Sequence, residues 1–379
     1  MSRPLKILHI ISGDLWAGAE VQAFTLMSHL AKLPGSKVAA VVLNDGTLAA
    51  KLRAAGISVR ILDEREIGPI GIYRKLRHFL RAWSPDVIHT HRTKETIIGS
   101  LANRTCQRVP CLRTVHGGNE RASSRGIRGI RQQIIRDLDR WCGRKFQQRI
   151  VSVTDELGRR LAAEFPASRI VVVENGVDAD LLRAGREVAE FRRRAPDSTH
   201  IGIVGRLVDV KRVDVFVMMA SLLRLEQTDR KWQFHIFGDG PLRPSLEALA
   251  KRLQIMDAME FHGHRHDMAT CIGGLDALVI CSDHEGLPMT ALEALALEIP
   301  TVAHAVGGLI EVVPQEFLVV HHNAKGYKRA VLTALSEDGR VLTKVNTASR
   351  LSMFSAERNA SRILALYDEM IAESLSDGQ

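Results

Sequence analysis

Short apolar runs alternate with helical patterns along most of this 379-residue chain, and this alternation limits its fold more than any other feature. In the first half the runs span residues 5–12, 38–43, 58–62, 86–89 and 111–115. Short apolar runs separated by helices are typical of buried parallel strands. The pattern predicts an α/β fold with doubly wound parallel sheets, whose ligands bind at the carboxyl ends of the strands.

The length predicts two domains of ordinary size, and a hydrophobic content of 45% is enough for two cores. Residues 181–198 are rich in arginine and end in Ala-Pro-Asp-Ser, which is typical of a linker. We therefore expect a first domain over residues 1–180 and a second that begins at residue 199. No run approaches 18 apolar residues, so no transmembrane helix is expected.

The net charge of +9 is distributed unevenly. Residues 1–180 carry 29 Lys and Arg against 17 Asp and Glu, a charge of +12, whereas residues 181–379 carry 23 against 26, a charge of −3. The first half therefore favours an anionic partner. Nucleic acid is not expected, because aromatic residues are only 5% and no recognition motif is present. Five scattered cysteines without a Cys-x-x-Cys pair indicate reduced thiols and a cytoplasmic protein.

The stretch over residues 276–311 has the most regular pattern in the chain. An apolar run at 276–280 predicts a buried strand, and a polar loop with Gly286 and Pro288 follows it. Pro288 suits the first position of a helix, and residues 289–297 are strong helix formers. Another strand is expected from residue 301, before a tight turn at Gly307-Gly308. The stretch therefore predicts a strand–loop–helix unit.

The start of this helix suits an anionic ligand. Backbone N–H groups of Gly286, Leu287 and Met289 are expected at the helix N-terminus, whose partial positive charge favours phosphate. Glu285 and Glu293 would be about 12 Å apart along a helix axis. That exceeds the ~5–9.5 Å of a carboxylate pair that hydrolyses one glycosidic bond. Two carboxylates at this separation suit hydroxyls on different parts of one long ligand, such as a nucleotide-sugar.

A second loop offers cations to such a ligand. A strand is expected to end at Val204, and Gly205 and Arg206 follow it. Lys211 comes just before the next predicted helix. Arginine presents a planar fork of donors and lysine a point charge, so together they suit a diphosphate.

The motifs and their order resemble the retaining GT-B glycosyltransferases of glycosyltransferase family 4. The donor-site likeness lies in Glu285-x7-Glu293, Pro300-Thr-Val302 and Gly307-Gly-x-x-Glu311. Further matching segments are Asn175-Gly-Val-Asp178, Gly205-Arg-Leu…Lys211 and Gly238-Asp-Gly-Pro241. The likeness covers nearly the whole chain. It departs from the family at Ala17 and Arg212, where the family has glycine.

The resemblance implies two Rossmann-like domains that face a central cleft. Residues 1–180 would form the acceptor-side domain, residues 199–352 the nucleotide-sugar donor domain, and residues 353–379 a helix that crosses back to the first domain. The Asn175-Gly-Val-Asp178 turn is expected to have a structural role.

The resemblance also implies roles for individual residues. Catalytic roles fall to His116, Arg206, Lys211 and Glu285, and donor binding falls to Gly18, Gly286, Leu287, Pro288 and Glu293. Gly18 would approach the donor diphosphate, and His116 would lie near the transferred sugar. Arg206, Lys211 and the helix N-terminus would stabilise the departing diphosphate. Glu285 would bind sugar hydroxyls and Glu293 the ribose.

Two groups of histidines are compatible with a metal, but none is expected. His89 and His91 lie on one face only if their strand continues, and no acidic partner follows them. The alternating His262, His264 and His266, followed by Asp267, fall where the resembling family has a strand and a loop near the nucleotide base, without metal. We therefore expect neither a metal nor another cofactor.

The expected function is transfer of a sugar from a UDP- or GDP-sugar to an acceptor hydroxyl, with retention of configuration. The acceptor would be a glycan or a lipid-linked molecule in cell-surface polysaccharide, lipopolysaccharide or glycolipid synthesis. Alternatives on the same architecture are a sugar-nucleotide epimerase or a phosphorylase. A catalytically idle protein that binds a nucleotide-sugar or a polyanion is a further alternative, although the complete set of Arg206, Lys211, Glu285 and Glu293 argues against it.

Residues 125–149 hold eight basic and two acidic residues. Their apolar residues recur at helical spacing: Ile127, Ile130, Ile134, Leu138, Trp141 and Cys142. One interpretation is a helix that packs on its sheet and leaves a solvated basic face. The other is a surface that binds anionic lipid or a lipid-diphosphate acceptor, which would place the protein at the inner face of the cell membrane.

Overall fold

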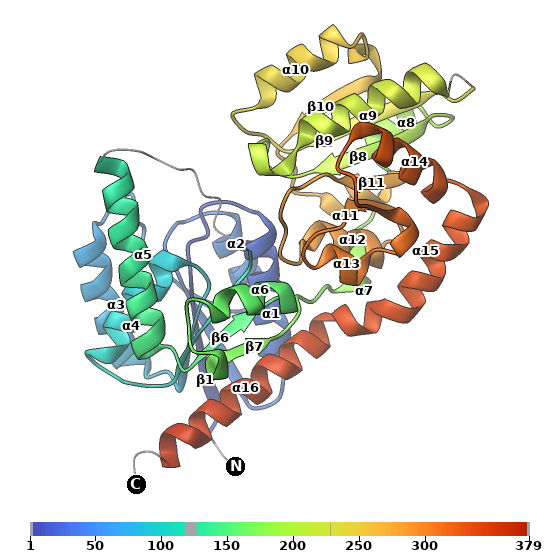
Figure 1. Ribbon diagram of the computed structural model, residues 1–379. Coiled ribbons are helices and arrows are strands. Elements are labelled where there is room, and N and C mark those ends of the chain that lie inside the picture. The colour runs from blue at the N-terminus through green and yellow to red at the C-terminus, as the bar shows by residue number, and fades with distance from the viewer. Residues whose placement is uncertain (1–2, 118–126, 228, 377–379) are drawn as a thin grey trace. The chain divides into compact units, whose positions relative to one another are not determined.

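The computed structural model describes residues 3–117, 127–227 and 229–376. The chain forms two compact units (Figure 1). The first contains Met1–Gly176 together with Ala356–Gln379, and the second contains Val177–Ser355. The division therefore falls at Gly176, a few residues before the predicted boundary at residue 180.

Residues 181–198, predicted as a linker, are folded into the second unit. They overlap α7 (Ala179–Ala184) and include α8 (Glu190–Arg194). Phe191 is buried, and the Arg192 guanidinium donates to the Gly274 carbonyl oxygen at 2.7 Å and to the Asp276 carboxylate at 2.9 Å. Arg192 in this segment therefore makes structural hydrogen bonds. The arginine-rich composition alone does not show whether such side chains bind the protein or face solvent.

The sheet of the first unit has seven parallel strands in the order β3-β2-β1-β4-β5-β6-β7. The strands are β1 (Leu5–Ile11), β2 (Ser36–Val42), β3 (Ser58–Ile61), β4 (Val87–Thr90), β5 (Cys111–Val115), β6 (Arg149–Ser152) and β7 (Ile170–Val172). All five runs predicted as strands before residue 116 are confirmed. Six helices follow strands: α1 (Gly18–Lys32), α2 (Thr47–Ala54), α3 (Pro69–Trp83), α4 (Thr93–Arg104), α5 (Ile127–Phe146) and α6 (Asp155–Ala162).

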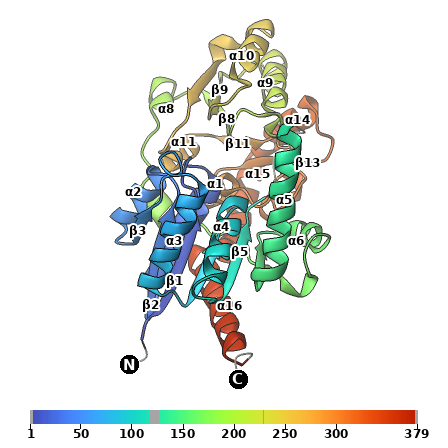
Figure 2. The ribbon, with the colours of Figure 1, turned by 90° about the vertical axis from the view of Figure 1, so that its left-hand side faces the viewer.

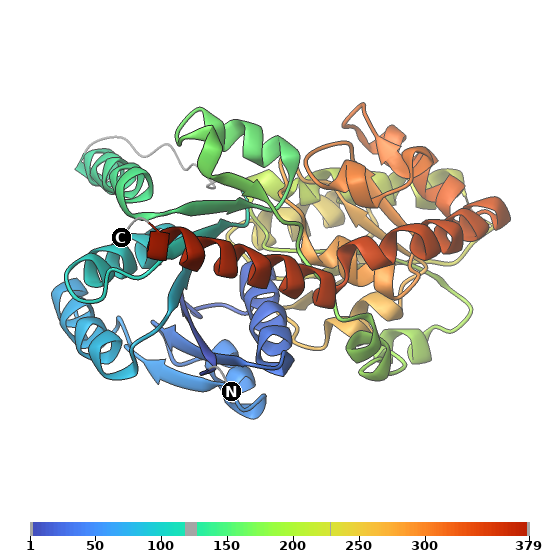
Figure 3. The ribbon, with the colours of Figure 1, turned by 90° about the horizontal axis from the view of Figure 1, so that it is seen from below.

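Two apolar layers cover the faces of this sheet. On one face, side chains of the strands pack with α1, α2 and the last helix, α16 (Ala356–Ser376). Figure 3 shows α16 running beside α1. On the other face the strands pack with α3 and α4, which lie in front of the sheet in Figure 2. The end of the chain therefore completes the core of the first unit.

The sheet of the second unit has six parallel strands in the order β10-β9-β8-β11-β12-β13. They are β8 (Thr199–Val204), β9 (Trp232–Phe237), β10 (Met259–Gly263), β11 (Ala277–Ile280), β12 (Thr301–His304) and β13 (Leu318–Val319). The helices after α8 are α9 (Val213–Glu226), α10 (Arg243–Arg252), α11 (Met268–Gly273), α12 (Met289–Ala296), α13 (Leu309–Val312), α14 (Ala324–Ala334) and α15 (Glu337–Arg350).

Each sheet has one point where the strand order reverses. In the first unit the chain builds outward from β1 to β3 and then returns to add β4 on the other side of β1. In the second unit it builds from β8 to β10 and returns to add β11 beside β8. Loops that leave the carboxyl ends of two such strands diverge and open a crevice, which is where ligands bind in open α/β sheets.

Within the described residues, no helix combines the length and the apolar character needed to cross a membrane. All five cysteines are free thiols, and four of them are buried.

Candidate functional site

The loops after β8 and β11 meet at the switch point of the second sheet. Lys211, at the end of the short 3₁₀ helix η2 (Asp209–Lys211), donates from Nζ to Oε1 of Glu285 at 2.6 Å. Ser282 Oγ donates to the same carboxylate oxygen at 2.6 Å. The structure therefore brings together two of the predicted catalytic residues. It adds Ser282, which had no sequence signal beyond its place after the strand.

A backbone contact holds the same two loops together. The Asp283 N–H donates to the Val210 carbonyl oxygen at 2.8 Å. Arg206 lies exposed in the loop that leads from β8 to Lys211. The predicted cations therefore share one loop, beside the loop that carries Glu285.

Arg212 takes the place of the glycine expected from the resembling family. Its φ of 46° and ψ of 44° lie in the left-handed region, where glycine has no steric cost. Its guanidinium contacts the carboxylates of Asp214 at 3.0 Å and Asp283 at 3.4 Å. The departure from glycine therefore leaves the turn conformation in place and adds ion pairs that tie it to the neighbouring loop.

A glycine turn supports the backbone that carries Glu285. Gly307 has a φ of 53°, and a Cβ at this position would lie 2.0 Å from the Glu285 carbonyl oxygen. The next residue, Gly308, donates its N–H to the Gly286 carbonyl oxygen at 2.7 Å. Only glycine permits so close an approach. The Gly307-Gly308 pair therefore positions residues 285 and 286.

Helix α12 starts one residue later than predicted, with Pro288 as its N-cap residue. Leu287 and Met289 are buried at this end of the helix. Glu293 is only 5% exposed, and burial raises the pKa of its carboxyl group to about 7. Burial is the only cause of this shift among the described residues, and a carboxyl group perturbed in this way is a candidate for a functional role.

The predicted residues of the first unit lie near the switch point of its sheet. Gly18 is the first residue of α1, after the N-cap residue Ala17. His116 directly follows β5, and its Nε2 lies 3.2 Å from Nδ1 of His91. Burial, with the nearby Arg92 charge as a smaller cause, lowers the pKa of His116 to about 3. Its imidazole is therefore neutral at physiological pH.

Two buried carboxylates beside these residues were not found from the sequence. The Arg92 guanidinium donates to Glu20, and the Ser12 hydroxyl donates to Glu95. Burial raises the pKa of Glu20 to about 7, although Arg92 opposes the shift, and it also raises the pKa of Glu95. The partners are 72 and 83 positions apart, so only the adjacency of β1 and β4 brings them together.

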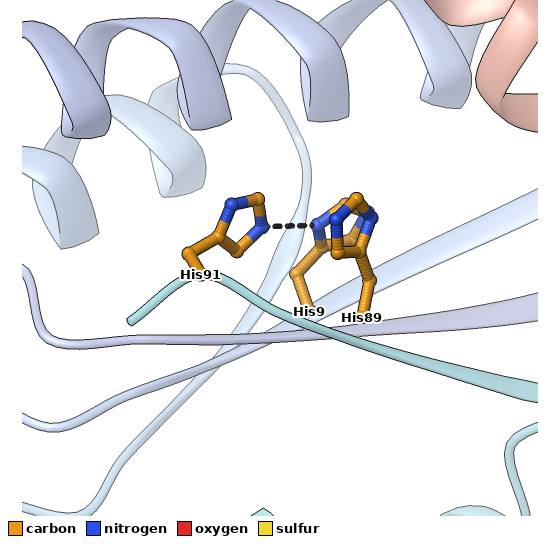
Figure 4. Close-up of side chains that lie close together, drawn as sticks. All are labelled: His9, His89 and His91. Carbon is orange, nitrogen blue, oxygen red and sulfur yellow. Dashed lines mark hydrogen bonds between the residues drawn. The ribbon is translucent and has the colours of Figure 1, made fainter. Parts of the chain in front are cut away.

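Two groups of potential metal ligands occur among the described residues: His9, His89 and His91, and His235, Glu260 and His262. In the first, β1 supplies the third histidine that the sequence could not place. The rings of His89 and His91 and those of His9 and His91 are nearly parallel, with centroids 4.5 and 5.2 Å apart, whereas those of His9 and His89 are tilted by 33° (Figure 4). Their nitrogens hydrogen-bond other groups: His91 Nε2 lies 2.9 Å from His9 Nδ1, and His89 Nδ1 lies 2.7 Å from the Tyr367 hydroxyl.

The second group also differs from the alternation of residues 262, 264 and 266. His262 hydrogen-bonds His235 at 2.9 Å across two strands. Asp267 instead forms an ion pair with Arg265 at 2.7 Å. His262 and Asp267, which belong to the same alternating segment of the sequence, therefore contact different partners.

Comparison with known families assigns both halves of the chain. Residues 16–181 match the model of Glycosyltransferase Family 4, and residues 198–337 match the model of Glycosyl transferases group 1. Together the two matches cover most of the chain, in the order predicted. The two parallel-sheet domains thus form the GT-B fold of glycosyltransferases. The chain therefore combines a Glycosyltransferase Family 4 domain with a Glycosyl transferases group 1 domain.

Similar proteins include several glycosyltransferases. A 2-deoxystreptamine glucosyltransferase of Streptomyces kanamyceticus is 26% identical over 77% of this chain and 80% of its own length. A D-inositol 3-phosphate glycosyltransferase of Geodermatophilus obscurus is 29% identical over 76% of this chain and 68% of its own length. Among solved structures, Anabaena HepE in complex with UDP-glucose has a TM-score of 0.78 at 17% identity, covering 98% of this chain and 100% of that chain.

Proposed function

We propose that this protein is a retaining glycosyltransferase that moves a sugar from a nucleoside-diphosphate sugar to an acceptor hydroxyl. The observation that carries the proposal is the Lys211–Glu285 pair at the switch point of the second sheet, beside the start of α12. A cation held at the end of β8 and a helix N-terminus both favour the negative charge of a diphosphate. The likeness to a structure that contains UDP-glucose supports a UDP-sugar as donor, with a GDP-sugar as the second candidate.

The proposed chemistry needs little beyond charge stabilisation and positioning. Arg206 and Lys211 would stabilise the negative charge that develops on the departing diphosphate. Glu285 would bind hydroxyls of the transferred sugar, and buried Glu293 would bind those of the ribose. His116 would orient the transferred sugar. The acceptor hydroxyl is the nucleophile, and retention would proceed by attack on the face from which the diphosphate leaves.

No divalent metal is part of the proposal, because the two cations and the helix terminus supply the charge that a metal would otherwise provide. Gly18, Gly286, Leu287 and Pro288 would complete the donor site through their backbone.

A panel of UDP-, GDP- and ADP-sugars tests the donor assignment by protection against thermal unfolding. We expect one nucleotide class to raise Tm in the wild-type protein, and Lys211→Ala to abolish most of the shift. Incubation with the selected donor then distinguishes the alternatives, because an epimerase converts the donor sugar without any acceptor. NMR of the product reports its anomeric configuration. An inverted product, or no protection by any nucleotide-sugar, would contradict the proposal.

We also propose that the acceptor lies at an anionic membrane surface that α5 contacts. The structure leaves much of the apolar stripe of this helix exposed: Ile130 at 64%, Ile134 at 62%, Leu138 at 36% and Trp141 at 46%. The helix packs on its own unit through Cys142, which belongs to the stripe, and through positions outside the stripe. Cys142 is buried, and Asp139 forms an ion pair with Arg113 at 2.8 Å. This distribution favours the membrane interpretation over a helix that buries its apolar stripe.

Basic side chains of α5 lie beside its exposed apolar stripe. A hollow of about 660 Å³ beside Trp141 is lined by Arg140, Arg144 and Lys145 together with Asp137 and Glu164. Each Lys or Arg near an anionic bilayer contributes about 1 kcal/mol, so four or five give partitioning in the range of about 0.2–1 mM. Insertion of the exposed apolar side chains adds to this.

Co-sedimentation with vesicles tests the membrane proposal. We expect binding to vesicles that contain phosphatidylserine at low salt, and weaker binding at high salt, because exposed charges are screened beyond about 8–10 Å. Ile130→Ser with Ile134→Ser, and Arg131→Glu with Lys145→Glu, should each reduce binding. Matched controls are Val341→Ser with Val345→Ser on α15, and Lys325→Glu with Arg329→Glu on α14, which are equally exposed pairs of the same kinds. If the wild-type protein ignores anionic vesicles at low salt, the membrane proposal fails and the transferase proposal stands.

A further inference from the structure

A line of buried polar side chains crosses the first unit beneath His116. Its members come from β1, from β4 and β5 and the residues that directly follow them, and from α16, and all are buried except the partly buried His116: His9, His89, His91, Thr114, His116 and Tyr367. Figure 4 shows the rings of His91 and His9 with the bond between them marked, and the His89 ring overlapping that of His9 in this view. The proposed function uses only His116, so the other five have no role so far.

Hydrogen bonds connect these side chains end to end. His116 Nε2 lies 3.2 Å from His91 Nδ1, and His91 Nε2 lies 2.9 Å from His9 Nδ1. His9 Nε2 lies 3.4 Å from the Tyr367 hydroxyl, which lies 2.7 Å from His89 Nδ1. His89 Nε2 reaches the Thr114 hydroxyl at 2.8 Å. The line is therefore one continuous chain of hydrogen bonds from Thr114 to His116.

Burial keeps every imidazole of the chain neutral. It lowers the pKa of His9 and His116 to about 3, and it lowers the pKa of His89 and His91 well below the ordinary value. A neutral imidazole donates from one nitrogen and accepts at the other. The donor of each ring therefore fixes the donor of the next, and the whole chain has only two arrangements, which differ in direction.

The distances favour one of the two directions. An O–H donor typically gives a shorter hydrogen bond than an N–H donor, so we assign the single hydrogen of the Tyr367 hydroxyl to the 2.7 Å bond with His89 rather than to the 3.4 Å contact with His9. The Tyr367 oxygen then accepts from His9, His9 accepts from His91, and His91 accepts from Nε2–H of His116. His116 is left with a bare lone pair on Nδ1.

That nitrogen is the open end of the chain. His116 Nδ1 is buried and has no hydrogen-bond partner in the described part of the protein. A buried acceptor without a partner costs stability, and such groups in native proteins often have a binding or catalytic role.

We propose that Tyr367, His9 and His91 are positioning residues that hold His116 in the Nε2–H tautomer, so that its Nδ1 accepts a hydrogen bond from a hydroxyl of the transferred sugar. The inference rests on the proposed transferase function for the identity of the hydroxyl, but the tautomer itself belongs to the free protein. It assigns a functional role to a tyrosine of the last helix, more than 250 residues after His116 in the chain.

Nitrogen NMR of the ¹⁵N-histidine-labelled protein measures the tautomer without any donor. We expect His116 to show a protonated Nε2 and an unprotonated Nδ1. Tyr367→Phe removes the hydroxyl that sets the direction, so the His116 signals should move toward an average of both tautomers. Tyr73→Phe is the matched control, because the Tyr73 hydroxyl is exposed and hydrogen-bonds only Thr105 among the described residues. It should leave His116 unchanged.

Activity gives a second and independent measurement. Loss of one neutral hydrogen bond typically lowers affinity or rate about threefold to tenfold, and we expect this loss in kcat/KM for Tyr367→Phe. His91→Leu should lose at least as much. His91→Gln should recover part of the loss, because its amide retains a donor and an acceptor. A role limited to packing would make Gln and Leu equivalent.

Several outcomes overturn the inference. They are a protonated Nδ1 or an equal mixture of tautomers in the wild-type protein, unchanged His116 signals in Tyr367→Phe, or a stoichiometric metal bound by His9, His89 and His91. Addition of UDP-glucose separates this inference from the proposed function. If the tautomer is as expected but neither Tm nor the His116 signals respond to UDP- or GDP-sugars, the donor assignment fails and the positioning of His116 stands.

Discussion

The two switch points place different chemistry at equivalent positions of two similar sheets. In the first unit the residues beyond the strands include neutral, hydrogen-bonded imidazoles and a carboxylate paired with Arg92. In the second unit Lys211 meets Glu285 at 2.6 Å, and Glu293 is buried nearby along the chain. The Rossmann-like topology therefore determines where a site forms, and the loop residues determine what it binds.

This difference suggests separate roles for the two units in the proposed reaction. A charged leaving group requires cations, which the second site offers. A sugar and its acceptor require hydrogen-bonding groups that do not attract the diphosphate, which neutral histidines provide. The predictions below test this division, beginning with the largest expected effect.

Removal of Lys211 should have the largest effect. We expect Lys211→Ala, and likewise Arg206→Ala, to lower kcat well over tenfold, and on the order of 10²-fold if each acts as a full charge-stabilising group. The fold should remain intact by circular dichroism. The control is Lys231→Ala, a lysine exposed in the same unit. Near-normal turnover in either site variant would show that the second site does not handle the leaving group.

Neutralisation of Glu293 should change stability in a pH-dependent way. Because burial raises its pKa from 4.5 to about 7, the folded protein binds the proton more tightly than the unfolded chain between these values. Stability is therefore lost as pH rises through this window. We expect Glu293→Gln to be more stable than the wild-type protein at pH 8, by at most about 3 kcal/mol, and to lose this advantage near pH 5.

Urea unfolding at the two pH values measures this effect. Glu316→Gln, an exposed glutamate in the same unit, is the control and should show no such dependence. An equal stability change at both pH values would mean that Glu293 is not a buried titrating group.

Substitution of Arg212, whose backbone is in the left-handed conformation, can separate backbone effects from charge effects on stability in the second site. Both Arg212→Gly and Arg212→Ala lose the half-exposed ion pairs, which contribute little. Only the glycine variant relieves the backbone strain, so it should be about 1 kcal/mol more stable than the alanine variant. Thermal unfolding of the two variants provides the measurement. Equal values would indicate that the turn carries no strain.

Chelation should have the smallest effect. We expect EDTA to leave activity unchanged, because cationic side chains and a helix terminus supply the charge at the second site. Loss of activity that Mg²⁺ or Mn²⁺ restores would place a metal in the reaction and remove the proposed role of Lys211.

The candidate site of the second unit was predicted from residues that lie close together in the sequence. Residues 205–211 and 285–293 each belong to a single strand–loop–helix unit, so composition and spacing locate them, and only the Lys211–Glu285 contact requires the structure. Strand positions were predictable for the same reason, since apolar runs define them. The helices within residues 181–198 were missed because arginine bound to backbone carbonyls has the same composition as solvated arginine.

The site of the first unit was much less predictable. His116 was identified only by resemblance. The hydrogen-bonded pairs of its chain are far apart in the sequence: His91 and His116 by 25 positions, His9 and His91 by 82, and His89 and Tyr367 by 278. Only the strand order and the return of α16 bring these residues together. The sequence also could not predict that the apolar stripe of α5 is largely exposed. Helical spacing shows that such a stripe exists, but not whether it faces the protein or the solvent.

The return of α16 has a consequence for synthesis on the ribosome. Residues 177–355 are contiguous and form a complete unit before the last helix is translated, so this unit can fold while the chain is still growing. The other unit lacks Ile363, Tyr367 and Met370 of its buried layer until α16 leaves the exit tunnel. Although its strands are made first, it is therefore expected to reach its native core last. Until then its nascent form exposes apolar surface that chaperones bind.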